Sequence, residues 1–260
     1  MHRKNPGPFL SLILMLALLG CSTSYVQPTS TSIPEPTGTA SVTPQPTHTP
    51  RPTLTTRPSL TPNMTATQHQ TELQAEAQSY FEKGYIASAE GKFMEYEDFR
   101  EEWAQLGWYR TWPLHQNAKN FYLSAHLKWT SAYRSPDLSG CGFAFARQED
   151  GEHYAVFLDR SRVYFVETSE YYRPIGSTRG TGRVNFGNPF DEPVEADFTL
   201  IVNGAYAYVL VDNGLVGEYT LSQSRNLRGE LGLTLLSGTN KDFGTRCEIT
   251  DIHVWTPWGG

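Results

Sequence analysis

The chain has 260 residues, of which 38% are hydrophobic and 18% are charged, and its net charge is −6. The charge is uneven, because residues 1–68 carry +3 and residues 69–260 carry −9. Binding to the phosphate backbone of nucleic acids depends on clustered Lys and Arg, so we expect no nucleic-acid partner. The sequence contains no apolar run of about eighteen residues, so we expect no membrane-spanning helix in the mature protein.

The first twenty residues have the pattern of an export signal. A basic start at residues 2–4 precedes an apolar run over residues 9–19, which is long enough for a signal peptide but too short to span a bilayer. The run ends in the motif LLGC at Cys21, which resembles the lipidation box of bacterial lipoproteins. The resemblance implies cleavage before Cys21, lipidation of its sulfur and an extracytoplasmic protein anchored to a bacterial membrane. A plain secretory signal with an incidental cysteine is the alternative.

Residues 21–68 are predicted to form a disordered tether. Of the 47 residues from 22 to 68, 29 are Ser, Thr or Pro, and such a segment cannot bury enough apolar surface to fold. Its recurring prolines favour an extended chain of ~3.1 Å per residue, which gives a reach on the order of 100 Å. The folded part is therefore expected in residues 69–260, with a short helix over 69–83 and a β-sandwich domain over 84–260.

Two helical segments are predicted at the start of the folded part. Thr71 and Gln74 have the spacing of a capping box, apolar residues recur at helical spacing after them, and Gly84 provides a C-cap. This pattern predicts a helix over residues 71–83. A further helical turn is predicted over residues 98–106.

The rest of the chain shows the period of β-strands. Apolar and polar residues alternate over 121–129 and again over 196–202. The pair Asn203-Gly204 predicts a two-residue type I′ hairpin, and a second turn follows at 212–214. Further strands are predicted over residues 141–147, 154–158, 163–167, 215–221, 231–236 and 246–255. Ten to twelve strands with little helix predict an all-β fold, a two-sheet antiparallel sandwich of the jelly-roll type.

Several of these segments together resemble a known fold family. They are NFYLSAHLKW, GCGFAFARQEDGEHYAVFLD, ADFTLIVNGAYAYVLVDNGLVGEY, GELGLTLLSG and CEITDIHVW. The series is similar to the concanavalin A-like jelly roll, in its laminin-G-like and keto-disaccharide-hydrolase-like versions, over residues 119–256. The resemblance implies the fold, but this fold carries lectins, hydrolases and spacer domains alike.

Two cysteines remain once Cys21 is assigned to the lipid. Cys141 and Cys247 both lie in predicted strands. In an oxidising extracytoplasmic compartment, an even pair predicts a disulfide. The alternative is two buried thiols that lie too far apart to join.

Signatures of catalysis are sparse in the sequence. A glycosidase of this fold presents two carboxylates on one face of a strand, about 5–5.5 Å apart for a retaining enzyme. The nearest pattern is Glu248 and Asp251, whose spacing of three places them on opposite faces of a strand unless a bulge intervenes. The motifs G-x-S-x-G, H-E-x-x-H and C-x-x-C do not occur.

Metal-binding patterns are also weak. His115, His126, His153 and His253 have no ligand-like neighbour at short spacing, and we expect them on the surface or on a sheet face. Calcium is the one cofactor that the resemblance implies, since laminin-G-like and lectin-like domains often bind it at the ends of loops. Its candidate ligands are Asp137, Asp212, Asn213 and Asp242, and turn chemistry explains these residues equally well.

Aromatic residues provide the remaining candidates for a binding site. Trp129 and Trp255 lie in strand patterns and are predicted to be core residues. Other aromatic side chains lie in irregular segments, where they either contact a ligand or serve the fold by covering a sheet face or packing within a loop. The candidate ligand-binding residues are Trp108, Tyr109, Trp112, Tyr171, Tyr172 and Arg173.

From these features we expect a surface-anchored module that binds carbohydrate or cell-wall glycan without catalysis. One alternative is a glycoside hydrolase of the keto-disaccharide type, which requires a pocket with converging acidic and polar groups. A second alternative is a protein-interaction module at the cell surface, which requires an exposed aromatic patch.

Overall fold

The computed structural model describes residues 64–169 and 171–259, with side chains from residue 68 onward. The predicted signal peptide, Cys21 and most of the predicted tether therefore lie outside the described residues. Within the described ranges, no helix is long and apolar enough to cross a membrane.

The described chain folds into two antiparallel sheets, which confirms the predicted sandwich. Sheet A has eight strands. Seven of them follow one another in a linear order, and the eighth, β2, pairs with β14 outside that order. In spatial order its strands are β1 (Gly91–Glu95), β14 (Thr245–Pro257), β4 (Phe121–Ser131), β10 (Val194–Asn203), β11 (Tyr206–Val211), β12 (Gly214–Thr220) and β9 (Arg179–Gly180), with β2 at Phe99–Trp103. The strands of sheet B are β3 (Trp108–Ala118), β13 (Gly229–Ser237), β5 (Gly140–Arg147), β6 (His153–Leu158), β7 (Val163–Thr168) and β8 (Tyr172–Pro174).

The main core lies between the two sheets. On β4 the side chains of Phe121, Leu123 and Leu127 belong to this core, as the predicted alternation requires. Trp129 also belongs to it and is 1% exposed, which confirms its predicted core position. The intervening polar residues of β4 consequently point away from the core, onto the outer face of sheet A.

The predicted disulfide between Cys141 and Cys247 is present. It joins β5 of sheet B to β14 of sheet A, with the two Cα atoms 6.1 Å apart. Both cysteines are fully buried in the main core. The bond therefore links the two layers of the sandwich through its interior.

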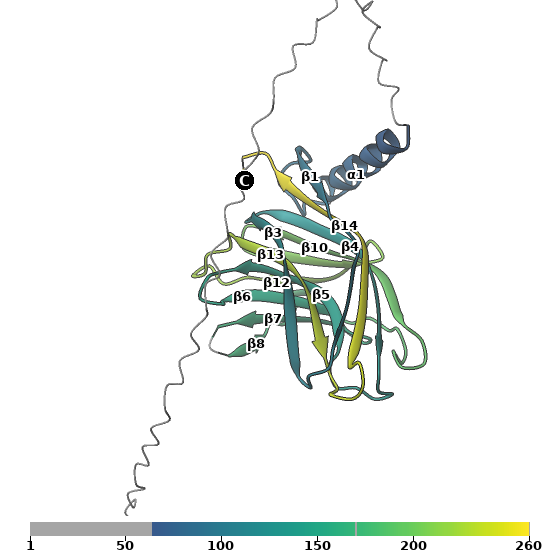
Figure 1. Ribbon diagram of the computed structural model, residues 1–260. Coiled ribbons are helices and arrows are strands. Elements are labelled where there is room, and N and C mark those ends of the chain that lie inside the picture. The colour runs from purple at the N-terminus through teal and green to yellow at the C-terminus, as the bar shows by residue number, and fades with distance from the viewer. Residues whose placement is uncertain (1–63, 170, 260) are drawn as a thin grey trace, which may run out of the picture. The chain divides into compact units, whose positions relative to one another are not determined.

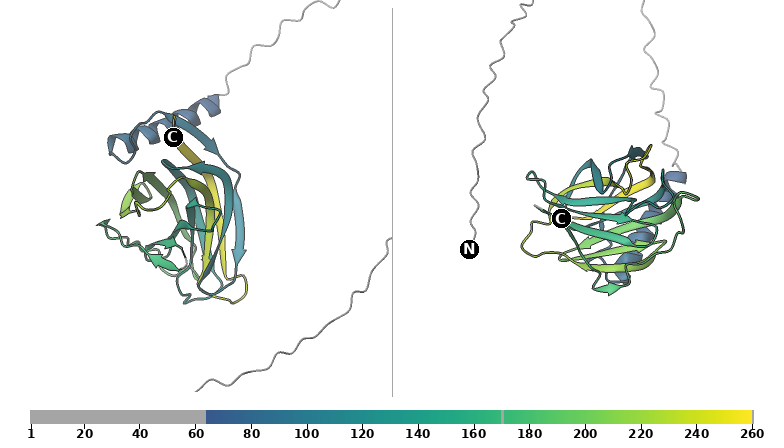
Figure 2. Two further views of the ribbon diagram at one scale, coloured as in Figure 1. Left: turned by 90° about the vertical axis from the view of Figure 1, so that its left-hand side faces the viewer. Right: turned by 90° about the horizontal axis from the view of Figure 1, so that it is seen from below.

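A helix, α1 (Met64–Glu82), packs on the outer face of sheet A (Figure 1). Its residues Ala77 and Tyr80 form a second apolar cluster with side chains of the sheet, among them Tyr122, Ile201 and Trp255. Figure 2 shows α1 outside the sandwich in two further views. The helix is thus a part of the folded domain, and the predicted core position of Trp255 belongs to this second cluster.

The start of the helix differs from the prediction. The helix begins at Met64, so Thr71 lies inside it and the predicted capping box is wrong. No proline follows Pro62 until Pro113, so nothing in the sequence interrupts a helix over residues 64–82. Its C-terminal end agrees with the prediction, because Gly84 has a positive φ of 74° and its N–H donates to the carbonyl oxygen of Phe81.

Two further local predictions are wrong. Residues 99–103 form strand β2 and not a helical turn, because their spacing of apolar residues fits both periods and pairing with β14 decides between them. The first hairpin turn consists of Gly204 and Ala205, and only Gly204 has a positive φ. The type I′ geometry occurs instead at Asp212 and Asn213, where φ is 48° and 63°.

Candidate functional site

The outer face of sheet A carries polar side chains in rows that run across the strands. In one row Ser124 of β4 lies opposite Thr199 of β10 and His253 of β14. In the next row His126 lies opposite Asp197. These rows lie between the part of the sheet covered by α1 and a more exposed part, so the sheet register itself gathers polar groups beside the helix.

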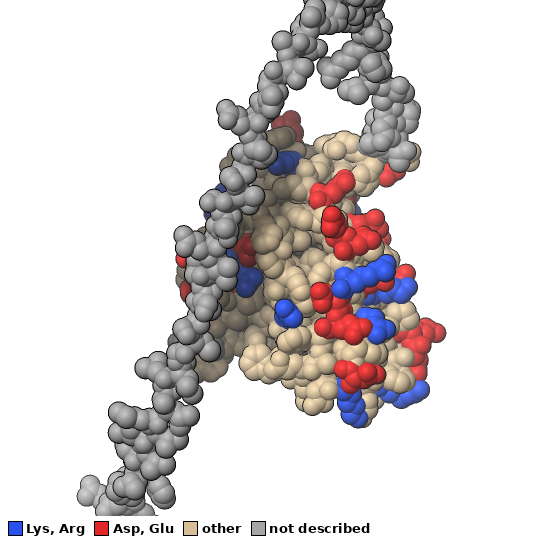
Figure 3. Space-filling model, in the orientation of Figure 1, with Lys and Arg blue, Asp and Glu red and all other residues tan. Residues whose placement is uncertain are grey.

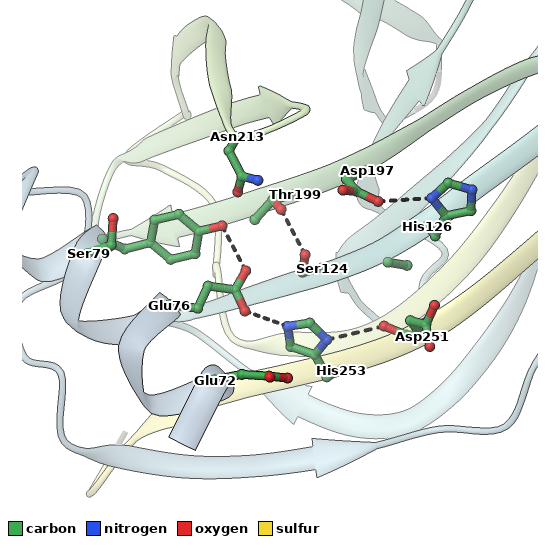
Figure 4. A pocket seen from close by; sticks show the side chains of 12 residues that line it. Glu72, Glu76, Ser79, Ser124, His126, Asp197, Thr199, Asn213, Asp251 and His253 are labelled. Carbon is green, nitrogen blue, oxygen red and sulfur yellow. Dashed lines mark hydrogen bonds and ion pairs between the residues drawn. The ribbon is translucent and has the colours of Figure 1, made fainter. Parts of the chain in front are cut away.

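A cleft of about 560 Å³ opens between α1 and these rows, and we call it the helix cleft (Figure 4). Its lining comes from α1, from three strands of sheet A and from the turn between β11 and β12. The lining residues are Glu72, Glu76, Ser79, Tyr80, Ser124, Ala125, His126, Asp197, Thr199, Asn213, Asp251 and His253. Carboxylates, imidazoles, hydroxyls and an amide thus converge on one cavity.

A β-bulge in β14 brings Asp251 into the helix cleft. The pairing of β14 with β4 shifts between Thr250 and His253, and Asp251 has a positive φ of 54°. Because of the extra residue, Glu248 and Asp251 both lie on the outer side of the sheet, which their spacing of three allows only when a bulge intervenes. Glu248 does not line the cleft, since it pairs with Arg100 at 2.6 Å.

Glu76 joins the helix to the sheet at the back of the cleft. Its Oε1 accepts a hydrogen bond from the Tyr80 hydroxyl at 2.8 Å, and its Oε2 accepts one from His253 Nε2 at 2.8 Å. His253 Nδ1 lies 3.1 Å from the carbonyl oxygen of Asp251. Both ring nitrogens of His253 therefore face acceptors, an arrangement that fits the imidazolium form.

The pKa shifts of His253 and Tyr80 agree with this hydrogen bonding. Burial alone lowers the pKa of His253, but the hydrogen bond to Glu76 and its negative charge outweigh burial and raise the pKa. Burial, reinforced by the charge of Glu76, raises the pKa of the Tyr80 hydroxyl well above its usual range. Tyr80 therefore stays a hydrogen-bond donor at any physiological pH.

A second histidine lies on the open side of the cleft. His126 Nδ1 is 2.9 Å from Asp197 Oδ1, and its Nε2 is 3.4 Å from Glu195 Oε1. The hydrogen bond to Asp197 raises the pKa of His126, although partial burial lowers it, and Glu195 adds to the increase. The backbone N–H of Asp197 donates to Asp212 Oδ1 at 3.0 Å, so the β11–β12 turn holds this part of β10 in place.

Beyond the cleft, the same face of sheet A carries a ladder of alternating charges. Across four strands, Arg100, Glu248, Lys128 and Glu195 lie side by side, with ion pairs of 2.6 Å and 2.7 Å at its two ends. Figure 3 shows acidic and basic side chains interleaved on the right-hand side of the visible face. The basic groups of this ladder are paired with carboxylates and do not line the helix cleft.

Sequence reasoning did not identify the helix cleft. It placed His126 and His253 on a sheet face, as the structure also does, but without partners. A signal for the strand part was present, because residues 124–126 and 197–199 place Ser, His, Asp and Thr on the outward side of two predicted strands. No sequence pattern indicated that α1 would cover this face.

The structure places the predicted ligand-binding residues in different parts of the fold. Tyr109 and Tyr172 line an apolar groove of about 180 Å³ on the outer face of sheet B, which we call the aromatic groove. Their ring centroids are 5.3 Å apart. The ring of Trp108, which is 53% exposed, lies nearly perpendicular to that of Tyr172, with the two centroids 6.4 Å apart. Tyr171, the residue directly before β8, is 79% exposed. The Tyr109 hydroxyl is held by His153 and Thr168 at 2.6 Å and 2.8 Å.

Two of the predicted site residues lie elsewhere. Trp112 packs against the main core, with its ring 5.0 Å from that of Phe99. Arg173 forms an ion pair with the buried carboxylate of Glu167. The structure therefore brings together Trp108, Tyr109 and Tyr172, and it separates Trp112 and Arg173 from them.

The candidate calcium ligands are spread over different turns. Asp212 and Asn213 form the β11–β12 turn, Asp242 lies in the β13–β14 connection, and Asp137 lines the aromatic groove. Among the described residues, no group of three or more His, Cys, Asp or Glu side chains is arranged to hold a metal ion. Positive φ values at Asp212 and Asp242 show that turn geometry requires residues of this kind there.

The fold and the cleft together define the class of this protein as a two-sheet jelly-roll sandwich with one packed helix. No protein-family model matches the chain, and no curated protein sequence matches it. Among solved structures, carbohydrate-binding module CBM66 from Bacillus subtilis is similar over 63% of this chain and 95% of that chain, with 10% identity and a TM-score of 0.44.

Two other solved structures show a comparable level of similarity. A galectin from Caenorhabditis elegans matches 60% of this chain and 94% of its own length, with 15% identity and a TM-score of 0.35. A fructosyltransferase from A. japonicus has 17% identity and a TM-score of 0.43, and the match covers 66% of this chain. This chain spans only 27% of the length of that fructosyltransferase.

Proposed function

We propose that this protein binds a carbohydrate in the helix cleft. The observation that carries the proposal is the convergence of carboxylates, hydroxyls, an amide and two imidazoles from α1, β4, β10, β14 and the β11–β12 turn around one cavity. Sugar hydroxyls both donate and accept hydrogen bonds, and a carboxylate accepts from two of them at once. The volume of about 560 Å³ lies within the range of roughly 300–1,000 Å³ that small-molecule sites occupy.

The cleft is also held in shape before any ligand enters. Glu76 bridges Tyr80 and His253, and Ser124 bonds to Thr199 at 2.8 Å. A site whose groups are already positioned loses less entropy on binding than one that must be ordered. This supports binding as the primary role of the cleft.

The test uses the full chain in detergent, screened on a glycan array and then titrated by calorimetry with the glycan it retains. We expect Asp197→Asn and Asp251→Asn each to weaken binding about two- to fivefold or more, since each removes a charged hydrogen-bond acceptor from a partly exposed site. Trp108→Ala and Tyr172→Ala are the matched controls, because they alter the aromatic groove on the opposite sheet. Loss of binding in these controls alone would move the site to that groove, and retention of no glycan would overturn the proposal.

A second candidate is glycoside hydrolysis in the same cleft. It is favoured by the carboxylates that line the cleft from three elements, Glu72 and Glu76 on α1, Asp197 on β10 and Asp251 on β14. Such a set offers groups for general acid and base catalysis. Release of reducing sugar from a panel of disaccharides, abolished by Asp251→Asn, would establish hydrolysis. A disaccharide that binds and is recovered intact would leave binding alone.

We further propose that Cys21 carries a lipid that holds the protein at a bacterial membrane. The motif at Cys21 and the Ser, Thr and Pro-rich segment after it support the proposal. Expressed in a bacterial host, the wild-type chain is expected in the detergent phase of a Triton X-114 partition, and Cys21→Ser in the aqueous phase. Equal partition of the two proteins would contradict the lipid anchor.

A further inference from the structure

The helix cleft has an acidic lining. Four carboxylates and two histidines line it, and no Lys or Arg among the described residues does. Two of the carboxylates are matched by the histidines, since Glu76 pairs with His253 and Asp197 pairs with His126. Their charges are thus compensated within the site.

The other two carboxylates of the cleft have no such compensation. Glu72 accepts a hydrogen bond from Gln68 at 3.0 Å, and neither Glu72 nor Asp251 forms an ion pair with any residue in the described part of the chain. Figure 4 shows them on the two sides of His253, with Glu72 on the helix and Asp251 on β14. The entrance of the cleft therefore holds two exposed negative charges from different elements.

A second cavity of about 270 Å³ adjoins the first. Asp251 and His253 line both cavities, so these two residues stand at the junction. The second cavity adds the carboxylates of Glu95 and Asp98 and the imidazole of His69, and again no Lys or Arg within the described part of the chain lines it. Glu95 pairs with His69 at 2.8 Å, which leaves Asp98 as another carboxylate without an ion pair among the described residues.

We infer that the ligand is an amino sugar oligomer with free ammonium groups, two or more units long, whose ammonium groups pair with Glu72 and Asp251. This inference rests on the proposed carbohydrate-binding function. Uronic acids, sulfated sugars and phosphorylated sugars would place like charges together and would be repelled. A sugar ammonium instead forms charge-assisted hydrogen bonds with the free carboxylates, and these are about twice as strong as neutral ones. Two adjoining cavities that share Asp251 match a ligand with a repeated unit.

The experiment compares ligands that differ only in charge. Glucosamine oligomers, their N-acetylated counterparts of equal length and oligogalacturonate are titrated into the full chain at low and high salt. We expect the free-amine oligomer to bind about tenfold more tightly than the acetylated one, with a preference that shrinks as salt screens the carboxylates. Oligogalacturonate is expected not to bind.

Two variants test which carboxylates bind the ammonium groups. Glu72→Gln and Asp251→Asn are each expected to reduce the preference for the amine about two- to fivefold, the range for partly exposed ion pairs, while affinity for the acetylated oligomer changes less. Glu149→Gln is the matched control, because Glu149 is an exposed carboxylate in the turn between β5 and β6 on the other sheet. The control should leave the preference unchanged.

The outcomes separate this inference from the proposed function. Equal affinity for amine and acetylated oligomers at all salt concentrations would overturn the inference and leave carbohydrate binding in place. A preference for the amine that survives both Glu72→Gln and Asp251→Asn would overturn the assigned position. Absence of binding to every glycan would remove the proposed function as well.

Discussion

The pKa values of two histidines on opposite sheets are shifted in opposite directions, because their surroundings offer different partners. His253 faces the Glu76 carboxylate and a carbonyl, which raises its pKa against the effect of burial. His153 Nδ1 donates to the carbonyl oxygen of Gly151 at 2.7 Å, and its Nε2 accepts from the Tyr109 hydroxyl. Burial, assisted by the charges of Arg147 and Arg225, lowers the pKa of His153.

The two histidines are therefore expected to contribute opposite pH dependence to stability. A raised folded pKa makes the contribution of His253 fully present below the unfolded value of about 6.5 and lost as pH rises through the folded pKa. We expect His253→Gln to lower the free energy of unfolding by about 1–2 kcal/mol near pH 5.5 and by less near pH 8.5. Urea denaturation at the two pH values measures this.

For His153 the sign is reversed. Its lowered folded pKa means that it contributes stability above the unfolded pKa, and that this contribution is lost as pH falls toward the folded pKa. We expect His153→Gln to make the protein lose less stability on acidification than the wild type does. His115, whose side chain is largely exposed, provides the control substitution. If the free energy of unfolding depended on pH in the same way in His153→Gln and in the His115 control, the protonation state assigned to His153 would be contradicted.

At the scale of elements, α1 decides whether the helix cleft exists. Tyr80 is 1% exposed and meets the ring of Tyr122 edge-on at 5.1 Å, whereas its neighbour Phe81 is exposed. The helix is therefore attached to sheet A through Tyr80, its largest buried side chain, through Ala77 and through the hydrogen bond between His253 and Glu76.

We expect Tyr80→Ala to release α1 from the sheet without unfolding the sandwich. Loss of a large buried aromatic side chain costs about 3–5 kcal/mol, and this cost falls on the contact between α1 and sheet A. Hydrogen exchange measures it, with amides of residues 68–82 expected to lose protection while those of β4 and β10 keep theirs. Phe81→Ala should leave both sets protected. Unchanged protection of α1 in Tyr80→Ala would show that other contacts hold the helix.

The strands could be predicted from the sequence more reliably than the two short helical segments. The alternation over residues 121–129 matches β4 because one side of that strand is buried between the sheets. In residues 99–103, Phe99 and Trp103 are four apart, a spacing that suits one face of a helix and one face of a strand alike. Pairing with β14, which is distant in sequence, selected the strand.

At the scale of the whole molecule, the disulfide closes a loop of 106 residues between the two sheets. We expect the double variant Cys141→Ala and Cys247→Ala to lose about 4–5 kcal/mol of unfolding free energy, the value that the chain-entropy model gives for a loop of this length. Guanidinium denaturation with and without reductant measures the loss. Reductant should destabilise the wild type and have no effect on the double variant. Equal stability of oxidised and reduced wild type would contradict this contribution.

The sequence by itself determined the properties that depend on local pattern and composition. Alternation over short segments predicted the strands and the sandwich, and an even pair of cysteines predicted the disulfide. Local patterns suffice here because, in a strand without a bulge, the two-residue period sets the side on which each residue lies.

Only the tertiary structure decided where the binding groups meet. Glu76 and His253 are 177 residues apart in the chain, and they meet because α1 packs on a sheet whose order places β14, β4 and β10 side by side. The bulge at Asp251 changes which side of β14 each residue occupies, and no spacing rule indicates its position in advance. The site arises from strand order and helix packing, which are free-energy differences summed over the whole fold and not properties of any one segment.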